Sequence, residues 1–336
     1  MRILIATGIY PPYAGGPSYY AKSLKDAFEK LGHTVIVRTF TIEHNLPTGI
    51  RHLVFFFKTV VAYIRADVTL VFDTFSVALP VVLLQKLFGG KMIIRTGGDF
   101  LWEQYVERTH EKVPFSKFYL QERHFTRKEK MIFSLTRWVL RCADHVVFNS
   151  EYQRRIWCIP YVLTFKKTSI IENAFDGSTV DSCLHTKKNF LCITRNIQIK
   201  NTDILRNAFV LAQKRNPTIS LDVYYDIPHS EAMRMLGSCY CAILVSVSDI
   251  APNFALEALS MQKPIILTKE NGISDRIGTM ALYVDPLDTQ AIADAMVTMA
   301  DDTTYDAYVS QIKKFSYRRI YDDIARDFIQ CIQNLG

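Results

Sequence analysis

The chain has 336 residues, of which 49% are apolar, and it carries a formal net charge of +7. A chain of this length is expected to form two domains, each with its own core. Its longest apolar runs, such as residues 77–84, fall well short of the roughly 18 to 20 residues of a membrane span. Neither a transmembrane helix nor a signal peptide is therefore expected. The seven cysteines show no metal or redox spacing, which favours reduced thiols in a cytoplasmic protein.

Predicted strands and helices alternate along the first half of the chain, the pattern of a parallel sheet with crossover helices. Strands are expected at 3–6, 35–40, 68–72, 91–95 and 145–149, and helices at 18–31 and 53–65. The loop after the first strand contains Gly15 and Gly16 ahead of Pro17, so the backbone there can approach a phosphate or a sugar closely. This loop lacks G-x-G-x-x-G spacing, and the second strand ends without an acidic residue. A dinucleotide-dependent dehydrogenase is therefore not expected.

A carboxylate, Asp99, follows the strand predicted at 91–95, in the sequence TGGDFLWE. Because ligands of open α/β sheets bind beyond the carboxyl ends of the strands, Asp99 is expected at the ligand-facing edge of the first domain. There it can orient an acceptor or accept its proton. The alternative is that Asp99 only caps the helix that follows.

Positive charge is concentrated in residues 112–141, which contain eight Lys and Arg residues against Glu122 and Glu129. Large apolar residues are interleaved with these charges, as in a segment that lies on an anionic membrane surface. No nucleic-acid-binding motif accompanies the charge, so nucleic acid is not an expected partner. The alternative is that the apolar residues pack onto the first domain while the charges are solvated.

A linker is expected over 173–188, and a second series of strands follows at 190–193, 220–225, 241–246 and 264–268. The loop after the first of these strands carries Arg195 and Lys200, ahead of a helix that begins near Thr202 or Asp203. Two cations at the carboxyl edge of a sheet can hold a diphosphate, the guanidinium as a directional fork and the ammonium as a compact charge. Either cation alone is an ordinary solvated charge.

The stretch SDIAPNFALEAL, residues 248–259, sets two carboxylates eight residues apart around a predicted helix start. Asp249 lies in the loop before the helix, and Pro252 suits its first turn, where a missing N–H costs nothing. The free N–H groups of a helix start attract an anion. Glu257 shares a helical face with Asn253 and can accept hydrogen bonds from hydroxyl groups. The alternative is that Glu257 only solvates a surface helix.

In its order of motifs, the chain resembles the retaining glycosyltransferases of family 4, which have the two-domain GT-B fold. Arg195 and Lys200 match the family's R-x4-K signature, and Asp249 and Glu257 match its E-x7-E signature, with Asp in place of the first Glu. The opening MRILIATGIYPPYAGGPS and the segments IIRTGGDFLWE, VVFNSEYQRRIW and IIENAFDGS also resemble family segments. The resemblance therefore covers almost the whole chain.

The resemblance implies an α/β fold of GT-B type, two Rossmann-like domains with parallel sheets that face each other across a cleft. The expected boundaries are 1–175 for the acceptor-side domain, 187–312 for the nucleotide-sugar-binding domain, and 315–336 for a helix that crosses back to the first. The second domain is expected to be short, because the chain after Tyr225 leads directly to the strand before Asp249, without a β-α unit usual in the family.

The implied activity is metal-independent transfer of a sugar, with retention, from a UDP- or GDP-sugar to a lipid-linked or polysaccharide acceptor in cell-envelope glycan synthesis. Arg195, Lys200 and the helix start at Pro252, Asn253 and Phe254 would hold the diphosphate, with Gly15 and Gly16 approaching it. Glu257 would bind the ribose, Asp249 the transferred sugar, and Asp99 would lie beside the acceptor. No DxD motif or His/Cys cluster is present, so no metal and no cofactor are expected.

Two alternatives to this enzyme stay open. One is a non-catalytic GT-B subunit that binds a sugar nucleotide, which the Asp at position 249 and the short second domain make credible. The other is a GT-B epimerase, which would convert the donor sugar without an acceptor. The expected location of the enzyme is the cytoplasm, with peripheral contact at the inner membrane face through 112–141.

Overall fold

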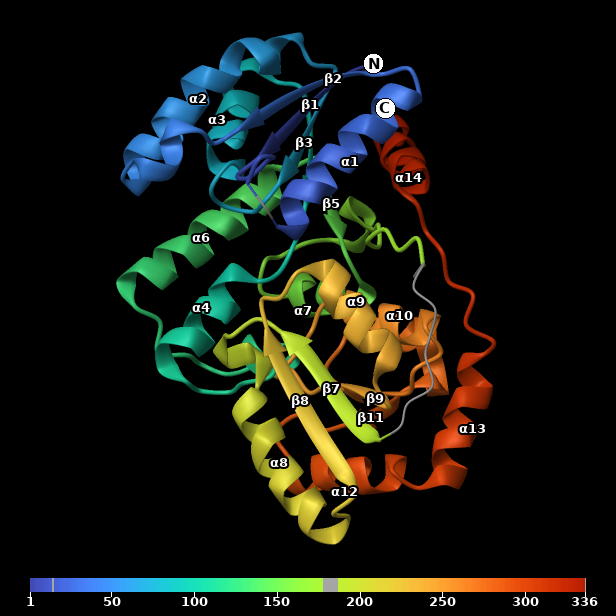
Figure 1. Cartoon of the computed structure of the whole chain (residues 1–336). Coiled ribbons are helices and arrows are strands. Elements are labelled where there is room, and N and C mark those ends of the chain that lie inside the picture. The colour runs from blue at the N-terminus through green and yellow to red at the C-terminus, as the bar shows by residue number, and fades with distance from the viewer. Residues whose placement is uncertain (14, 178–186, 336) are drawn as a thin grey trace. The chain divides into compact units, whose positions relative to one another are not determined.

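A computed structural model describes residues 1–13, 15–177 and 187–335, so much of the expected linker at 173–188 lies outside the described residues (Figure 1). The chain divides into two compact units. Unit 1 comprises residues 1–101, 124–174 and 319–336, and unit 2 comprises residues 102–123 and 175–318. No helix in the described parts of either unit combines the length and apolar character needed to cross a bilayer.

Unit 1 is built on a six-stranded parallel sheet with the order β2-β1-β3-β4-β5-β6. Its strands are β1 (Arg2–Thr7), β2 (Thr34–Thr39), β3 (Val68–Phe72), β4 (Lys91–Arg95), β5 (His145–Phe148) and β6 (Thr168–Ile170). The strands predicted from apolar runs are confirmed to within one or two residues at each end. The exception is β6, which has only three residues and was not predicted.

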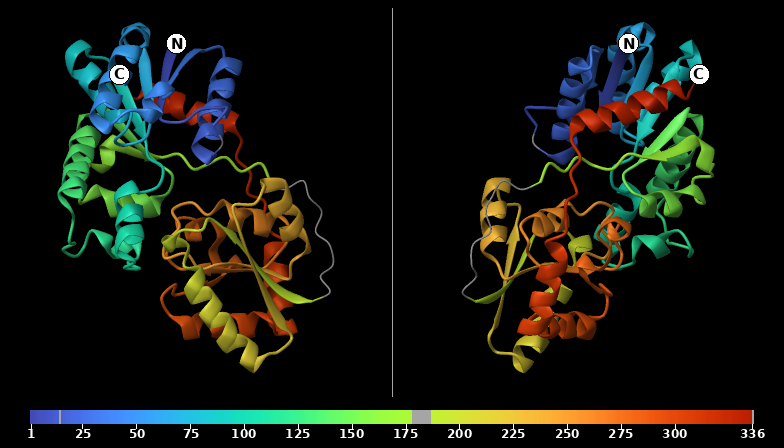
Figure 2. Two further views of the ribbon diagram at one scale, coloured as in Figure 1. Left: turned by 60° about the vertical axis from the view of Figure 1, so that its left-hand side comes forward. Right: turned by 90° about the vertical axis from the view of Figure 1, so that its right-hand side faces the viewer.

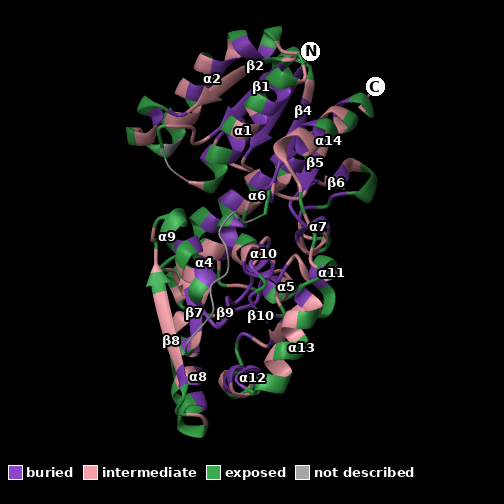
Figure 3. Cartoon of the chain, turned by 45° about the vertical axis from the view of Figure 1, so that its right-hand side comes forward, coloured by how far each residue is buried: buried purple, intermediate pink, exposed green. Residues whose placement is uncertain are grey.

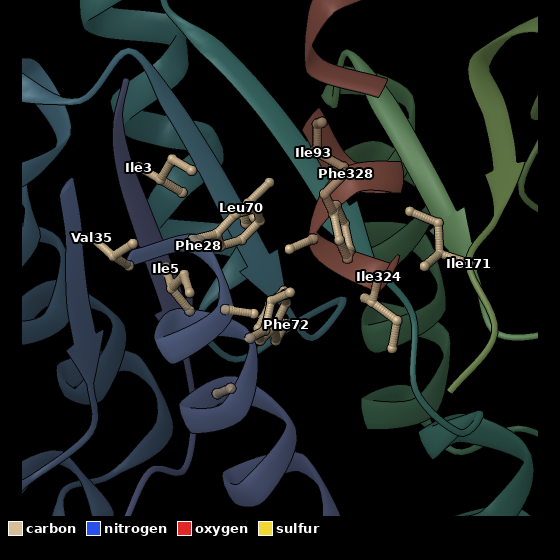
Figure 4. Close-up of a cluster of buried hydrophobic side chains, with 14 of the residues drawn as sticks. Ile3, Ile5, Phe28, Val35, Leu70, Phe72, Ile93, Ile171, Ile324 and Phe328 are labelled. Carbon is tan, nitrogen blue, oxygen red and sulfur yellow. The ribbon is translucent and has the colours of Figure 1, made fainter. Parts of the chain in front are cut away.

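Helices cover both faces of this sheet. They are α1 (Gly16–Lys30), α2 (Thr48–Arg65), α3 (Ala78–Phe88), α6 (Arg127–Cys142), α7 (Glu151–Cys158) and α14 (Tyr321–Gln333), with 3-10 turns η1 (Ile42–Asn45) and η2 (Phe165–Lys167). Helices α1 and α14 pack side by side (Figure 2). Their side chains share a core with the strands, in which Phe28 of α1 and Phe328 of α14 lie over Ile5 and Phe72 (Figure 4).

Residues 102–123 pack with unit 2, although the sequence predicts one domain over 1–175. They contain most of α4 (Phe100–Thr109) and all of α5 (Phe115–Phe118). The rings of Trp102 and Phe115 contact each other and are buried. The backbone N–H of Phe115 donates a hydrogen bond to the Ser248 hydroxyl, 2.9 Å away. The segment therefore belongs to unit 2 because its aromatic rings are buried there, although its position in the sequence suggests unit 1.

Unit 2 contains a five-stranded parallel sheet with the order β11-β10-β9-β7-β8. Its strands are β7 (Lys188–Thr194), β8 (Ile219–Tyr225), β9 (Cys241–Leu244), β10 (Ile265–Thr268) and β11 (Leu282–Val284). Buried clusters lie against both faces of the sheet, while the edge strand β8 is only partly buried (Figure 3). The predicted alternation of strands and helices is confirmed, so the expected α/β class holds in both units.

The helices of unit 2, besides α4 and α5, are α8 (Thr202–Arg215), α9 (His229–Ser238), α10 (Asn253–Ser260), α11 (Ser274–Ile277), α12 (Thr289–Met299) and α13 (Asp302–Ile312). Two 3-10 turns, η3 (Gln198–Lys200) and η4 (Gly278–Met280), complete it. In the described residues, α9 is the single regular element between β8 and β9. This agrees with the direct connection that the sequence predicts there.

Glu43 is a buried carboxylate that ties η1 to α2 in unit 1. Its side chain is fully buried and accepts hydrogen bonds from the Thr41 N–H at 2.6 Å and the Lys58 ammonium at 3.0 Å. Burial by itself raises the pKa of Glu43, but these hydrogen bonds outweigh it and hold the pKa below its ordinary value. The ionised form is therefore the one that the fold stabilises.

Glu43→Gln is expected to lower the free energy of unfolding by about 1.5 to 3 kcal/mol at neutral pH, the scale of a lost charge-assisted hydrogen bond. Because the pKa is lower in the folded state, this stabilisation is present above the unfolded-state pKa and is lost as the pH falls through the folded-state pKa. Urea denaturation at neutral and acid pH measures it. A difference between the two proteins that stays constant with pH would contradict this account.

Candidate functional site

A pocket of about 380 Å³ lies at the carboxyl ends of three neighbouring strands of unit 2. It adjoins Thr194 at the end of β7, Asp226 just after β8, and Leu244 at the end of β9. Parallel strands bring these ends to one edge of the sheet, where α/β proteins bind ligands. The other lining residues are Ile193, Arg195, Lys200, Ile227, Asp249, Ala251, Pro252, Asn253 and Phe254.

The loop from Arg195 to Asn201 is fixed by hydrogen bonds to neighbouring strands and loops. Asn201 has a left-handed backbone with φ of 60°, and its side-chain amide donates to the carbonyls of Val245 and Pro286 at 3.0 and 2.6 Å. The Val247 N–H donates to the Ile199 carbonyl at 2.8 Å. These bonds hold Lys200 beside the chain that leads to Asp249.

The segment 102–123 also contacts this loop and the start of the helix that follows it. The Glu107 carboxylate accepts a hydrogen bond from the Gln198 N–H at 3.0 Å, and Lys112 forms an ion pair with Asp203 at the start of α8. Sequence reasoning missed Glu107. No local signal could have found it, because its partner lies 91 residues further along the chain.

Lys200 and Asp249 form an ion pair in the pocket, with the Lys200 Nζ 2.7 Å from the Asp249 Oδ2. Their side chains are only 13% and 15% exposed, so water screens this pair much less than a surface pair. Both backbone groups of Asp249 are hydrogen-bonded. Its N–H donates to the Glu270 carbonyl, and its carbonyl accepts from the Gly272 N–H. The two residues that the sequence assigns to diphosphate and sugar binding therefore neutralise each other here.

Arg195 is exposed and lines the pocket. Among the described residues, its guanidinium makes no hydrogen bond or ion pair, in contrast to Lys200. A guanidinium in this situation can bind a phosphate through two parallel N–H groups without first breaking an internal bond. Arg195 is thus the cation of the pocket that is available to an anionic ligand.

Helix α10 begins at the pocket. Pro252 is its N-cap, and Asn253 and Phe254 form the first positions of the helix. The N–H groups at such a start lack helical partners and carry a partial positive charge. Glu257 lies one turn further along and is not a lining residue. Its carboxylate is 2.9 Å from His229 Nε2 at the start of α9.

Two lining or neighbouring residues were not predicted. Asp226 follows β8 with a left-handed backbone of φ 50° and adds a carboxylate to the pocket. Its place directly after an apolar strand was a signal that could have found it. His229 contacts Glu257 across 28 residues of sequence, so no local pattern indicates that pair.

The predicted site residues of the first domain lie in unit 1. Gly15 has φ of 141°, a backbone conformation that L side chains rarely adopt, and it precedes α1, whose first turn contains Pro17. Asp99 is 1% exposed, and one carboxylate oxygen accepts a hydrogen bond from the Trp157 indole N–H at 2.7 Å. The roles of Gly15, Gly16 and Asp99 toward a ligand remain predictions.

Unit 2 thus brings Arg195, Lys200, Asp249, Pro252, Asn253 and Phe254 together around one pocket. Within the part of the chain that the structure describes, no three His, Cys, Asp or Glu side chains are arranged to hold a metal. The pocket combines two cations, two carboxylates, a helix start and an apolar wall that includes Ile227 and Phe254. These groups match the diphosphate, hydroxyl groups and base of a nucleotide.

Part of unit 2 matches the model of a known family. Residues 223–302 match the family Glycosyl transferases group 1. The match contains Asp249, the start of α10 and Glu257, and it begins within β8. No curated protein sequence matches the chain significantly.

The fold of the whole chain is similar to that of several solved structures. HepE of Anabaena in complex with UDP shares 14% identity, with a TM-score of 0.67 over 99% of this chain and 100% of that one. A sucrose-phosphate synthase from Thermosynechococcus elongatus shares 14%, with a TM-score of 0.70 over 100% and 99%. The lipopolysaccharide outer core galactosyltransferase WaaB shares 13%, with a TM-score of 0.65 over 99% of each chain. The prediction of a GT-B fold is confirmed.

Proposed function

We propose that the protein is a retaining glycosyltransferase that uses a nucleotide-sugar donor, with UDP-sugars as the first candidates. The observation that carries the proposal is the pocket itself, where Arg195, Lys200 and the start of α10 converge within and beside the matched region. The solved structure of HepE in complex with UDP-glucose, whose fold is similar, supports a UDP-sugar as the donor.

In this proposal the chain's own groups perform the transfer. Arg195 and the free N–H groups of α10 bind the donor diphosphate, and Lys200 leaves Asp249 to join them. These cations stabilise the negative charge that develops on the leaving diphosphate, the role that a metal has in other enzymes. Asp249, released from Lys200, accepts hydrogen bonds from hydroxyls of the transferred sugar, and Glu257 accepts them from the ribose. The acceptor attacks from the face that the diphosphate leaves, which gives retention.

The acceptor that we propose is a lipid-linked or polysaccharide hydroxyl in cell-envelope glycan synthesis, with Asp99 beside it. The similarity in fold to WaaB, a lipopolysaccharide galactosyltransferase, supports this acceptor class. A cytoplasmic location with peripheral contact at the inner membrane face belongs to the same proposal. For Asp99 to reach an acceptor, its carboxylate must exchange the bond from Trp157 for one from the acceptor hydroxyl.

A thermal-shift screen of UDP, GDP, ADP and their sugar conjugates tests the donor. UDP is expected to stabilise the fold, by about 2.7 kcal/mol when its concentration is a hundred times its Kd. UMP, which lacks the second phosphate, is the matched control and should stabilise less at equal concentration. The same samples, supplied with donor and acceptor, should release UDP. Stabilisation without release would favour a non-catalytic binding subunit, sugar conversion without an acceptor would favour an epimerase, and no nucleotide effect would contradict the proposal.

A further inference from the structure

An apolar stripe runs along the outer side of α2 in unit 1. Ile50, Leu53, Phe57, Val61 and Ile64 are each more than half exposed, with Phe57 the most exposed at 65%. They recur every three or four residues, so they share one face of the helix. Core residues such as Phe55 and Ala62 occupy the opposite face and are buried. The helix therefore has two apolar faces, of which only one is covered.

Neighbouring helices extend this stripe. Helix α2 packs against α3, and α3 packs against α6, so the three form one layer on the sheet (Figure 1). The outward residues of α3 and α6 add further exposed apolar side chains, namely Leu83, Leu87, Phe88, Met131 and Trp138. We call the exposed apolar residues of α2, α3 and α6 the α2–α3–α6 face. Scattered surface hydrophobics need no partner, but five such residues along one face of α2, with more on the helices that pack beside it, are typical of an interaction site.

The exposed charges of these three helices are all positive. They contain nine Lys and Arg residues and a single acidic residue, Glu129. Glu129 is buried, and its carboxylate accepts a hydrogen bond from the Thr126 N–H in the cap of α6. The exposed basic residues are Arg65, Lys86, Arg127, Lys128, Lys130 and Arg141. The partner of this face must therefore combine apolar contact with negative charge.

We propose that the α2–α3–α6 face docks on an anionic lipid bilayer. Apolar side chains enter the boundary between headgroups and acyl chains, while the basic residues contact anionic headgroups. A second copy of the chain is a poor occupant, because two such faces would bring like charges together with no acidic side chain to offset them. The proposal rests on the proposed function, since docking would bring unit 1 to a membrane that holds a lipid-linked acceptor.

The sequence predicts membrane contact through residues 112–141, but in the structure only part of this segment is available for it. Phe115 and Phe118 are buried in unit 2, so they do not reach a bilayer. Lys112 and Arg123 form ion pairs with Asp203 and Glu111. Only the α6 half of that segment contributes to the face, and α2, outside it, contributes half of the exposed apolar side chains.

Sedimentation with vesicles tests the proposal on the full chain, without donor or acceptor. The protein is expected to bind vesicles that contain phosphatidylglycerol, and to bind pure phosphatidylcholine vesicles or high-salt samples less. The double variant Leu53→Glu, Phe57→Glu should weaken binding roughly fivefold or more, because it places charge at the apolar boundary. Val210→Glu, at a half-exposed position on α8 of unit 2, is the matched control and should bind normally.

Three results would overturn the proposal. One is equal binding of the wild type to neutral and anionic vesicles. Another is loss of binding in Leu120→Glu, at an exposed position of unit 2, but not in the α2 variant. The third is a dimer, seen by sedimentation velocity, that the α2 variant dissociates, since a second copy would then cover the face. UDP stabilisation of the same variants, measured in parallel, keeps a failed membrane proposal distinct from a failed glycosyltransferase proposal.

Discussion

Glu257→Gln is expected to lower turnover by about tenfold or more while the fold stays intact, because only a charged carboxylate accepts strong hydrogen bonds from two ribose hydroxyls. Glutamine keeps the size of the side chain and can still accept a hydrogen bond from His229, so packing at this partly exposed position is preserved. The measurement is the steady-state rate of nucleoside diphosphate release with the identified donor.

Glu231→Gln is the matched control for this experiment, since it makes the same chemical change on the exposed surface of α9, close to His229 in sequence. Its turnover should equal that of the wild type. Full activity in Glu257→Gln would mean that α10 does not hold the ribose, and the assignment of the second unit would have to be abandoned. A loss of activity accompanied by a lower melting temperature would point to folding instead.

Replacing either cation of the pocket is expected to lower affinity for the nucleoside diphosphate by roughly 1.5 to 3 kcal/mol, the scale of a lost charge-assisted hydrogen bond. The two variants should differ. Arg195→Ala removes a group that makes no ion pair among the described residues, so only the ligand is affected. Lys200→Ala also removes the ammonium that, in the wild-type complex, offsets the repulsion between the diphosphate and the Asp249 carboxylate, which is 15% exposed. We therefore expect the larger loss in Lys200→Ala.

Isothermal titration of UDP into the variants measures these losses. Asp249→Asn added to Lys200→Ala should restore part of the affinity, because it removes the unpaired charge. Lys269→Ala is the control, since Lys269 pairs with Asp285 at the surface of the same unit. Unchanged affinity in both Arg195→Ala and Lys200→Ala would remove these residues from the site.

Local patterns predicted most of the fold because the strands of both sheets are short apolar runs with clear ends. The elements that the sequence missed depend on distant contacts. Strand β6 has only three residues, which pair with β5. Helix α2 begins at Thr48, five residues before the expected start, where Arg51 donates to the carbonyl of Glu43 in η1. Residues 102–123 join unit 2 through aromatic burial that no local periodicity encodes.

The same distinction holds at the pocket. Arg195, Lys200, Asp249 and Asn253 were predicted because each follows a recognisable strand or starts a recognisable helix, and the topology of a parallel sheet brings such positions together. The ion pair between Lys200 and Asp249 was not predicted, since spacing alone assigned the two side chains to separate parts of a donor. The contact of His229 with Glu257 spans 28 residues of sequence, and that of Glu107 with Gln198 spans 91. Local spacing could not predict either contact.

The assignment of α14 to unit 1 has a consequence for synthesis on the ribosome. Ile324 and Phe328 belong to the core that β1, β3 and α1 form near the start of the chain, yet all of residues 175–318 are translated before them. Multidomain chains commonly complete their N-terminal domain first. Here the nascent first unit must wait, with the apolar surface beneath α14 open, until the second unit has left the exit tunnel. Transiently exposed apolar surface makes a chain prone to aggregation, so the polypeptide is vulnerable during that interval.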